Sequence, residues 1–278
     1  MGMKIWWQHI FPTQDQMERE VGFTPSVPLK DVEVHFQKHL QTVARPGTEI
    51  NAFYLKHSAY MVQSYYLEML NTLWVIDGVI EAEKQGYDAA IIGCAMDPGL
   101  LEARQAVDIP VIGPMEAAMF LACSLGSRVG VITVMDELVP MCERAIRHSG
   151  LEARVAGRVR VHDMGEDWIN MLFEMILKPE VIQPQFDMLC KASVKDGAEV
   201  IIPACCALSP AASLLGYREV PGTGVPIVDV TLAAVKLAET LVDLKRSVGL
   251  GKSRKWSYKS QPAQVRDLMR SLVYMARA

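Results

Sequence analysis

Two cysteines at equivalent positions of an internal repeat are the residues with which this chain could do chemistry. The first copy reads GYDAAIIGC, from Gly86 to Cys94, and the second reads GAEVIIPAC, from Gly197 to Cys205. In both copies a glycine lies eight residues before the cysteine, and an apolar run typical of a buried strand lies between them, at Ala89–Ile92 in the first copy. The repeat predicts one thiol at the carboxyl end of each strand, and it selects Cys205 over its neighbour Cys206.

Paired thiols suit the inversion of a carbon next to a carbonyl, because a proton leaves one face and another arrives on the opposite face. General acid–base catalysis is most efficient when the pKa of the group lies near the working pH. The ordinary thiol pKa of about 8.5 is lowered at a helix N-terminus, where free backbone N–H groups stabilise the thiolate. Since Cys94 and Cys205 both stand between a strand and a helix, we expect lowered pKa values and a role as the catalytic pair.

The elements that position these thiols are expected to form βαβ units. Helical spacing over Leu100–Val107 follows the first cysteine, and a second strand is expected at Val111–Ile112. Ligands bind at the carboxyl ends of the strands in such parallel sheets. The repeat therefore predicts two similar α/β lobes, the first made of residues 1–115 and 225–278 and the second of residues 116–224.

Hydrophobic periodicity predicts the remaining elements. Strands are expected over Met3–Ile10, Thr48–Leu55, Arg128–Thr133 and Val155–Val161. Helices are expected over Leu29–Val43, Glu68–Gln85, Glu116–Leu125, Leu138–Ser149, Trp168–Leu177, Pro184–Lys195, Leu232–Leu244 and Ala263–Ala278. The last of these packs either on the body or on another subunit, and we expect a homo-oligomer.

The composition of the chain limits the kinds of partner that it is expected to bind. The net charge of −4 and the absence of a Lys/Arg cluster argue against nucleic acid, and no apolar run is long enough to cross a membrane. The N-terminus lacks the pattern of a secretory signal, so we expect a cytoplasmic protein whose six cysteines are reduced thiols. No His/Cys spacing fits a zinc site, and no glycine-rich phosphate loop is present. A small molecule is the expected partner.

Further candidate site residues have structural alternatives. Asp97 either contacts substrate or caps the helix that follows it. Thr133 ends a strand and is a candidate hydrogen-bonding partner, while His9 and His57 are candidate acid/base groups, although single histidines seldom have that role. The candidates for substrate contact are Asp97, Thr133, Cys206, Ala95, Pro12, Thr13 and His57. The cysteines within helical patterns are expected in the core: Cys123, Cys142 and Cys190.

The chain resembles the aspartate/glutamate/hydantoin racemase superfamily, and within it the hydantoin and allantoin racemase branch. The residues that carry the resemblance lie between about Gly78 and Asp229: Gly93–Leu100 (GCAMDPGL), Asp108–Gly113 (DIPVIG), Glu116–Met119, Val129–Thr133 and Gly197–Cys205. The resemblance implies two pseudo-symmetric Rossmann-like α/β lobes with parallel sheets and the active site in the cleft between them. It also implies catalysis without a cofactor, with one cysteine on each face of the acidic carbon.

Three departures from the family pattern concern regions expected near the substrate. An Asn-Pro-Asn-Thr-like loop usually follows the first strand, whereas this chain has Gln8–Thr13 there. The second cysteine is usually followed by a small residue or Thr and then Gly, but here by Cys206–Ala207. The segment His57–Trp74 is rich in bulky aromatics. These departures bear on the identity of the substrate more than on the chemistry.

The residues and the resemblance together predict a cofactor-independent racemase that acts at a carbon α to a carbonyl. A hydantoin-like ring or a related small amide or carboxylate is the expected substrate. The alternatives within the superfamily are an arylmalonate-decarboxylase-like lyase, a maleate-type cis–trans isomerase and a cysteine-dependent hydrolase. Cys94 argues against the lyase, which needs only the second cysteine. A two-lobed binding protein without turnover is the alternative from another class.

Overall fold

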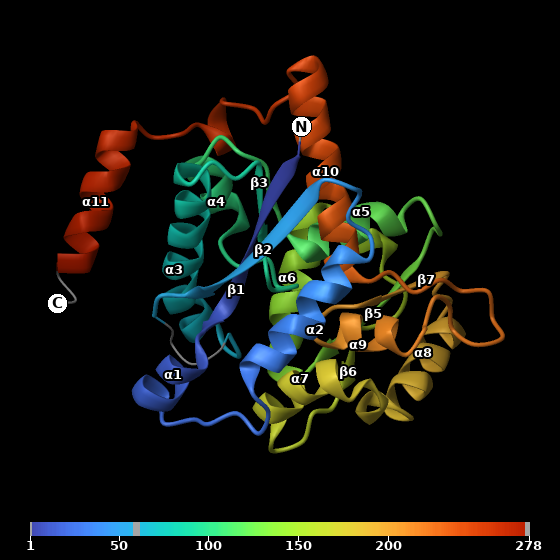
Figure 1. Cartoon of the computed structure of the whole chain (residues 1–278). Coiled ribbons are helices and arrows are strands. Elements are labelled where there is room, and N and C mark those ends of the chain that lie inside the picture. The colour runs from blue at the N-terminus through green and yellow to red at the C-terminus, as the bar shows by residue number, and fades with distance from the viewer. Residues whose placement is uncertain (1, 58–61, 276–278) are drawn as a thin grey trace.

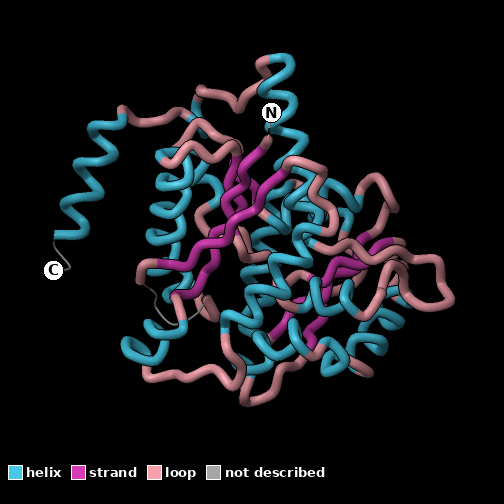
Figure 2. Tube along the Cα trace, viewed as in Figure 1, coloured by secondary structure: helices cyan, strands magenta, loops and turns pink. Residues whose placement is uncertain are grey.

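Two separate parallel sheets form the framework of the protein. The computed structural model describes residues 2–57 and 62–275. The first sheet has the order β2-β1-β3-β4, with β1 at Met3–Pro12, β2 at Thr48–Leu55, β3 at Ala89–Ile92 and β4 at Val111–Ile112. The second has the order β6-β5-β7, with β5 at Val129–Val134, β6 at Arg160–His162 and β7 at Val200–Pro203. The predicted α/β class with two lobes of parallel sheet is confirmed (Figure 2).

Helices cover both sheets, as parallel sheets require (Figure 1). They are α1 (Gln14–Gln16), α2 (Leu29–Gln41), α3 (Tyr65–Lys84), α4 (Leu100–Ala106), α5 (Pro114–Ala122), α6 (Val139–Ser149), α7 (Trp168–Leu177), α8 (Gln185–Lys195), α9 (Leu208–Leu214), α10 (Val230–Val248) and α11 (Ala263–Met275). The short helices α1 and α9 were not delimited by periodicity, because α1 spans less than one turn and α9 has no polar face with charged residues. The predicted helices are present, with ends that agree or differ by a few residues, and the last three residues of the predicted helix Ala263–Ala278 lie outside the described residues.

The apolar runs that predicted strands are buried on both faces. All four residues of β3 and of β7, and all six of β5, are buried. β1 extends beyond the expected strand Met3–Ile10 and includes Pro12. β6 is shorter than the strand expected from Val155, because the chain turns at Gly157, whose φ is +70°. Val155 itself forms only an isolated bridge to Val129.

Alternation along β1 directs neighbouring side chains to opposite faces of the first sheet. The Gln8 side chain points at Gly78 of α3, where a Cβ would lie 1.7 Å from its Oε1. The Trp7 ring instead packs on Phe36 of α2, with ring centroids 5.1 Å apart. α2 and α3 therefore cover opposite faces of this sheet, and the face under α2 is the one that bears Trp7, His9 and Phe11.

The segment before α10 belongs with the second sheet. Ile227 bridges Ile201 of β7, although the predicted division assigns residues 225–278 to the first lobe. α10 then packs against β3, β4 and α5, so the chain returns to the first lobe where that helix begins. The other limits of the predicted lobes stay a prediction.

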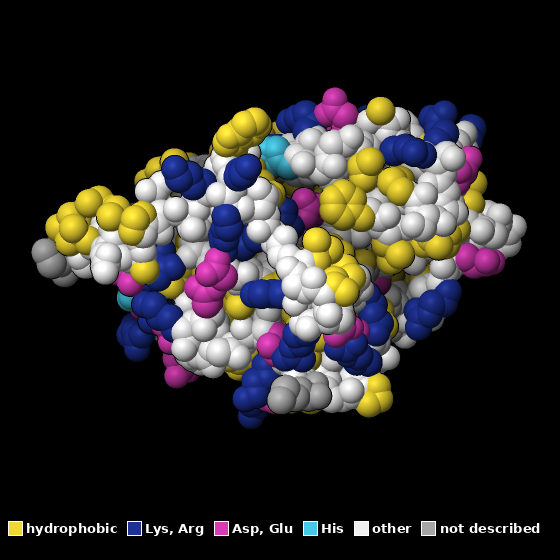
Figure 3. Space-filling view, turned by 90° about the horizontal axis from the view of Figure 1, so that it is seen from above, with side chains coloured by type: hydrophobic (Ala, Val, Ile, Leu, Met, Phe, Trp, Pro, Cys, Tyr) yellow, Lys and Arg dark blue, Asp and Glu magenta, His cyan; other side chains and the backbone are white. Residues whose placement is uncertain are grey.

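The C-terminal helix α11 stands away from the body (Figure 1). It contacts the body through polar groups, because Arg270 donates to Asp77 of α3 at 2.6 Å and Arg266 donates to the Ala106 carbonyl at 2.6 Å. Its apolar side chains are 45–55% exposed, and Figure 3 shows hydrophobic side chains along this arm: Val265, Leu268, Met269 and Leu272. Among the described residues, no helix is long and apolar enough to cross a membrane.

Candidate active site

Cys94 and Cys205 lie in matching turns directly after β3 and β7. Each cysteine N–H donates to the carbonyl two residues before it, at 2.8 Å for Cys94 and 2.9 Å for Cys205. The N–H two residues after each cysteine approaches its sulfur: the Met96 nitrogen lies 3.5 Å from Sγ of Cys94, and the Ala207 nitrogen lies 3.4 Å from Sγ of Cys205. The sequence repeat is therefore also a repeat of local geometry. Cys206 occupies the position that Ala95, which has no thiol, occupies in the first copy.

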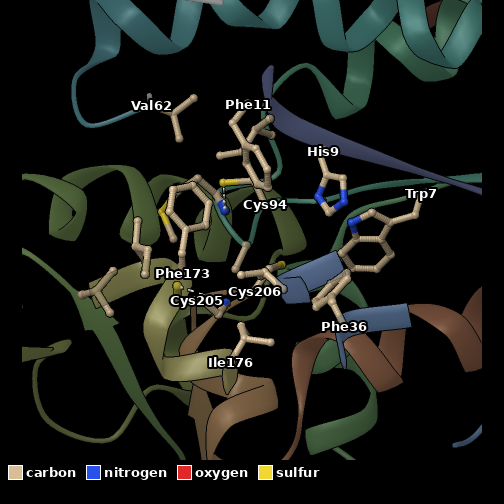
Figure 4. A pocket seen from close by; sticks show the side chains of 18 of the residues that line it. Trp7, His9, Phe11, Phe36, Val62, Cys94, Phe173, Ile176, Cys205 and Cys206 are labelled. Carbon is tan, nitrogen blue, oxygen red and sulfur yellow. Dashed lines mark hydrogen bonds between the residues drawn. The ribbon is translucent and has the colours of Figure 1, made fainter. Parts of the chain in front are cut away.

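Both cysteines line one pocket between the lobes (Figure 4). The first lobe contributes side chains from β1, α2 and the end of β2, and the loop after β3. The second lobe contributes α7, the end of β5 and the loop after β7. Most of the wall is apolar, with Phe11 and Phe173 in edge contact at a centroid distance of 5.4 Å. Ala95 and Cys206 also line this pocket.

The turn that carries Cys94 is pressed against β1. The Gly93 N–H donates to the Gln8 carbonyl at 2.7 Å, and a Cβ on Gly93 would lie 2.7 Å from that oxygen and 2.7 Å from Nε1 of Trp7. Glycine is required here because any side chain would separate the turn from the strand. The turn is also tied to the second lobe, since Arg144 of α6 donates to Glu68 of α3 at 2.6 Å and to the Met96 carbonyl at 3.5 Å.

The pKa values of the thiols are raised, not lowered as the sequence predicted. Burial raises the pKa of Cys94, the Met96 N–H opposes this, and the negative charges of Glu68 and Cys205 add to it. Burial likewise raises the pKa of Cys205 against the N–H groups of Leu208 and Ala207. The N–H groups act in the expected direction, but desolvation of the thiolate outweighs them. Both thiols are therefore protonated at neutral pH in the unliganded protein.

A polar group stands in the wall that the first lobe contributes. His9 Nε2 lies 2.8 Å from Glu33 Oε2, and the Tyr54 hydroxyl donates to the same oxygen at 3.3 Å. Figure 4 shows His9 beside Trp7 on one side of the pocket. Lysine and arginine are absent from the described residues that line the pocket, so its lining holds no permanent cation.

Comparison with known proteins places this geometry in a family. A family model described as Asp/Glu/Hydantoin racemase matches residues 31–238. The chain is 33% identical over 222 residues to the hydantoin racemase of Pseudomonas sp. (strain NS671), a match that covers 80% of this chain and 85% of the relative. The chain belongs to the Asp/Glu/hydantoin racemase family. The predicted resemblance is confirmed, and with it the expectation of a racemase-type enzyme.

Other relatives agree with this assignment. The hydantoin racemase of Rhizobium meliloti is 34% identical over 179 residues, which are 63% of this chain and 68% of the relative. The crystal structure of allantoin racemase from Pseudomonas fluorescens is 27% identical, with a TM-score of 0.73 over 93% of this chain and 97% of that one. The allantoin racemase from Klebsiella pneumoniae has the same fold, with a TM-score of 0.72 over 94% of both chains and 22% identity.

Asp97 does not line the cysteine pocket of this racemase-family protein. Its carboxylate instead accepts from the N–H groups of Met115 at 3.1 Å and Glu116 at 3.0 Å, at the N-terminus of α5. The capping alternative therefore describes Asp97, but the capped helix is α5 and not the helix that follows in sequence. The N-cap residue of α5 is Gly113, where a Cβ would lie 2.4 Å from Cγ of Asp97.

Removing this cap is expected to lower stability. The substitution Asp97→Ala leaves two N–H groups of α5 unpaired, and we expect the free energy of unfolding to fall by about 1–2 kcal/mol. Urea unfolding followed by circular dichroism measures the change. The exposed Glu102 is the control, because Glu102→Ala is expected to change stability by no more than about 0.5 kcal/mol. Equal effects of the two substitutions would contradict a capping role for Asp97.

The remaining candidates for substrate contact lie outside the lining of the cysteine pocket. Thr133 is fully buried in β5, and its hydroxyl has no hydrogen-bonding partner among the described residues. Pro12 is buried at the end of β1. Thr13 borders a groove on the other face of the first sheet, where its hydroxyl donates to Gln16 at 3.0 Å. His57 packs against Trp74 with ring centroids 4.7 Å apart.

Several pocket residues were not found from the sequence. Trp7 and Phe11 share the face of β1 with His9, and this alternation was the available signal. Glu33 and Tyr54 had no motif of their own, because they lie on separate elements that meet only in the folded chain. Of the cysteines expected in the core, Cys142 and Cys190 are buried, and Cys123 is half-buried at the end of α5.

Proposed function

We propose that the chain is a racemase in which Cys94 and Cys205 form the acid/base pair and a hydantoin-type ring is the substrate. The observation that carries this proposal is the matching geometry of the two cysteines around one pocket between the lobes. The hydantoin racemases among the relatives support the ring as substrate class.

One thiolate and one thiol suffice for each turnover. The thiolate takes the proton from the ring carbon on its face, and the bonding electrons move into the neighbouring carbonyl to give an enolate. The thiol on the opposite face then gives its proton to the same carbon, which inverts it and leaves the charge on that sulfur. Backbone N–H groups beside both sulfurs favour the thiolate at either position. This form of the enzyme acts on the opposite enantiomer, and proton exchange of the two sulfurs with solvent restores the original form.

The lining of the pocket favours a neutral ring with an apolar substituent. Among its described residues, lysine and arginine are absent, so no permanent cation pairs with a substrate carboxylate. Burying an unpaired carboxylate is costly, which disfavours aspartate or glutamate as substrate. The apolar wall can receive an aromatic or aliphatic substituent instead: Phe11, Leu138, Leu172, Phe173 and Ile176.

Proton NMR in D₂O tests the proposal with a panel of 5-substituted hydantoins, allantoin, aspartate, glutamate, maleate and an arylmalonate. We expect deuterium at the α-carbon and loss of optical rotation with a hydantoin that bears an apolar substituent. Loss of a carboxylate, a fumarate signal or ring opening would select the lyase, the cis–trans isomerase or the hydrolase. The absence of exchange with every hydantoin would contradict the proposal.

The matching turns support Cys205, and not Cys206, as the second base. The substitution Cys206→Ala is therefore expected to leave kcat/KM for racemisation within about threefold of wild type, because it removes no proton-transferring group. Chiral chromatography of the substrate measures the rate, and Cys142→Ala serves as a buried-cysteine control outside the pocket lining. Loss of activity in Cys206→Ala alone would move the second base by one residue.

The homo-oligomer expected from the sequence stays a prediction. The exposed apolar side chains of α11 are the feature of the structure that agrees with it.

A further inference from the structure

Two residues in the wall of the cysteine pocket carry buried polar atoms without a partner among the described residues: Nε1 of Trp7 and Oε1 of Glu33. Most buried polar groups in native proteins form hydrogen bonds, and leaving one unpaired costs about 1–3 kcal/mol. One of these atoms is a donor and the other an acceptor. An unpaired donor and an unpaired acceptor around one pocket indicate a ligand that offers an acceptor to the first and a donor to the second.

The unpaired donor lies next to the turn that carries Cys94. A Cβ on Gly93, the residue before this cysteine, would lie 2.7 Å from Nε1 of Trp7. In Figure 4 the indole nitrogen is on the edge of the ring that faces His9 and the pocket. An oxygen that accepts from this N–H would therefore lie beside the thiol on that face. A substrate carbonyl next to the reacting carbon needs a hydrogen-bond donor at this position.

The unpaired acceptor is held on the same wall by groups that bond its other oxygen. Glu33 Oε2 lies 2.8 Å from His9 and accepts from Tyr54 at 3.3 Å, which leaves Oε1 unpaired. Phe36, one turn further along α2, packs on both Trp7 and His9, with ring centroids at 5.1 and 5.7 Å. The donor and the acceptor are thus parts of one packed cluster.

The charge state of Glu33 suits an acceptor. Burial alone would raise its pKa, but the hydrogen bond and charge of His9, with the Tyr54 hydroxyl and the nearby Gln37 amide, hold it below the ordinary value. An ionised carboxylate accepts hydrogen bonds and cannot donate them. Glu33 therefore selects an N–H group and repels a second carboxylate.

We propose that Trp7 and Glu33 recognise an –NH–C(=O)– edge of the substrate, with the Trp7 N–H donating to the carbonyl and Glu33 Oε1 accepting from the neighbouring N–H. His9 is a positioning residue that orients Glu33. On a hydantoin this edge is the C4 carbonyl, which becomes the enolate oxygen, together with the N3–H. This assignment rests on the proposed function, which identifies the ring. It adds the residues that form hydrogen bonds with the ring.

The test compares a ring that keeps the N–H with one that lacks it. The ligands are 5-benzyl-5-methylhydantoin and its 3-methyl derivative, which have no proton at C5 and so report binding without turnover. Calorimetry with wild type is expected to show at least tenfold weaker binding of the methylated ring, because the Glu33 carboxylate loses its donor. In Glu33→Leu the two ligands are expected to bind within about threefold of each other, because no acceptor remains.

Two tryptophan variants test the donor. Trp7→Phe keeps an aromatic ring but removes the N–H, and we expect a 10- to 100-fold lower kcat/KM for 5-benzylhydantoin, by about the energy of one hydrogen bond to a developing charge. Trp6→Phe is the matched control, because the Trp6 indole already donates to Gln8 at 2.9 Å and lies outside the lining of the pocket. Its kcat/KM is expected within about threefold of wild type. Circular dichroism confirms that each variant is folded.

Failure of this inference differs from failure of the proposed function. Wild type that binds both rings equally, or folded Trp7→Phe with the kcat/KM of Trp6→Phe, would overturn the assignment while racemisation stands. Discrimination between the two rings by a protein that does not exchange the C5 proton of 5-benzylhydantoin would support the recognition and overturn the racemase proposal. Absence of binding and of exchange would overturn both.

Discussion

Replacing either Cys94 or Cys205 by alanine is expected to reduce kcat/KM for racemisation by about 10²- to 10⁴-fold, the usual contribution of a general acid or base. In the proposed mechanism each thiol serves one face of the acidic carbon, so inversion in either direction needs both. Chiral chromatography of a 5-substituted hydantoin measures the loss. The control is Cys206→Ala, which changes a third thiol of the same pocket.

The two variants are also expected to differ from each other in D₂O. The remaining thiolate in each variant can still remove the proton on its own face and exchange it with solvent without inversion. Residual deuterium exchange should therefore be confined to one enantiomer in Cys94→Ala and to the opposite enantiomer in Cys205→Ala. Full racemisation by either variant would rule out the two-base mechanism.

Racemisation is expected to accelerate with rising pH through the neutral range, by up to about tenfold per unit. Burial raises the pKa of Cys94 and of Cys205, so both are thiols in the neutral range and the reactive form has lost one proton. Below a raised pKa the thiolate fraction falls tenfold for each unit by which the pH drops. The rate is therefore expected to rise with pH through the neutral range.

The measurement is kcat/KM across this range, with the spontaneous racemisation of the hydantoin subtracted at each pH. Cys206→Ala should reproduce the wild-type profile, because its thiol transfers no proton. A profile that is flat between about pH 7 and pH 9 would mean that a thiolate is already present at neutral pH. In that case bound substrate or the backbone N–H groups would outweigh desolvation.

Short-range sequence patterns predicted most of the fold. The runs Ala89–Ile92 and Val111–Ile112 were delimited correctly, because strands buried on both faces are continuous apolar segments between turn residues. The repeat placed Cys94 and Cys205 in equivalent turns, since the same local sequence adopts the same local geometry. Such features depend on residues within about one helix or strand, so they can be predicted from the local sequence.

Contacts between distant segments decided the rest. Asp97 caps α5, which begins 17 residues later, and no local pattern distinguishes that helix from the nearer α4. The direction of the thiol pKa shifts depends on how deeply the two lobes bury the cysteines, which a helix-terminus argument ignores.

The sequence by itself determined two α/β lobes with one thiol each, because strands, turns and repeats depend on residues that are close together along the chain. Only the tertiary structure brought Trp7, Glu33 and His9 to the pocket that holds both thiols. β1, α2 and the cysteine loops are far apart along the chain, and packing of the first sheet against α2 makes them neighbours. The positions of the two thiols could therefore be predicted from the sequence, whereas the groups that we propose to recognise the substrate come together only in the folded chain.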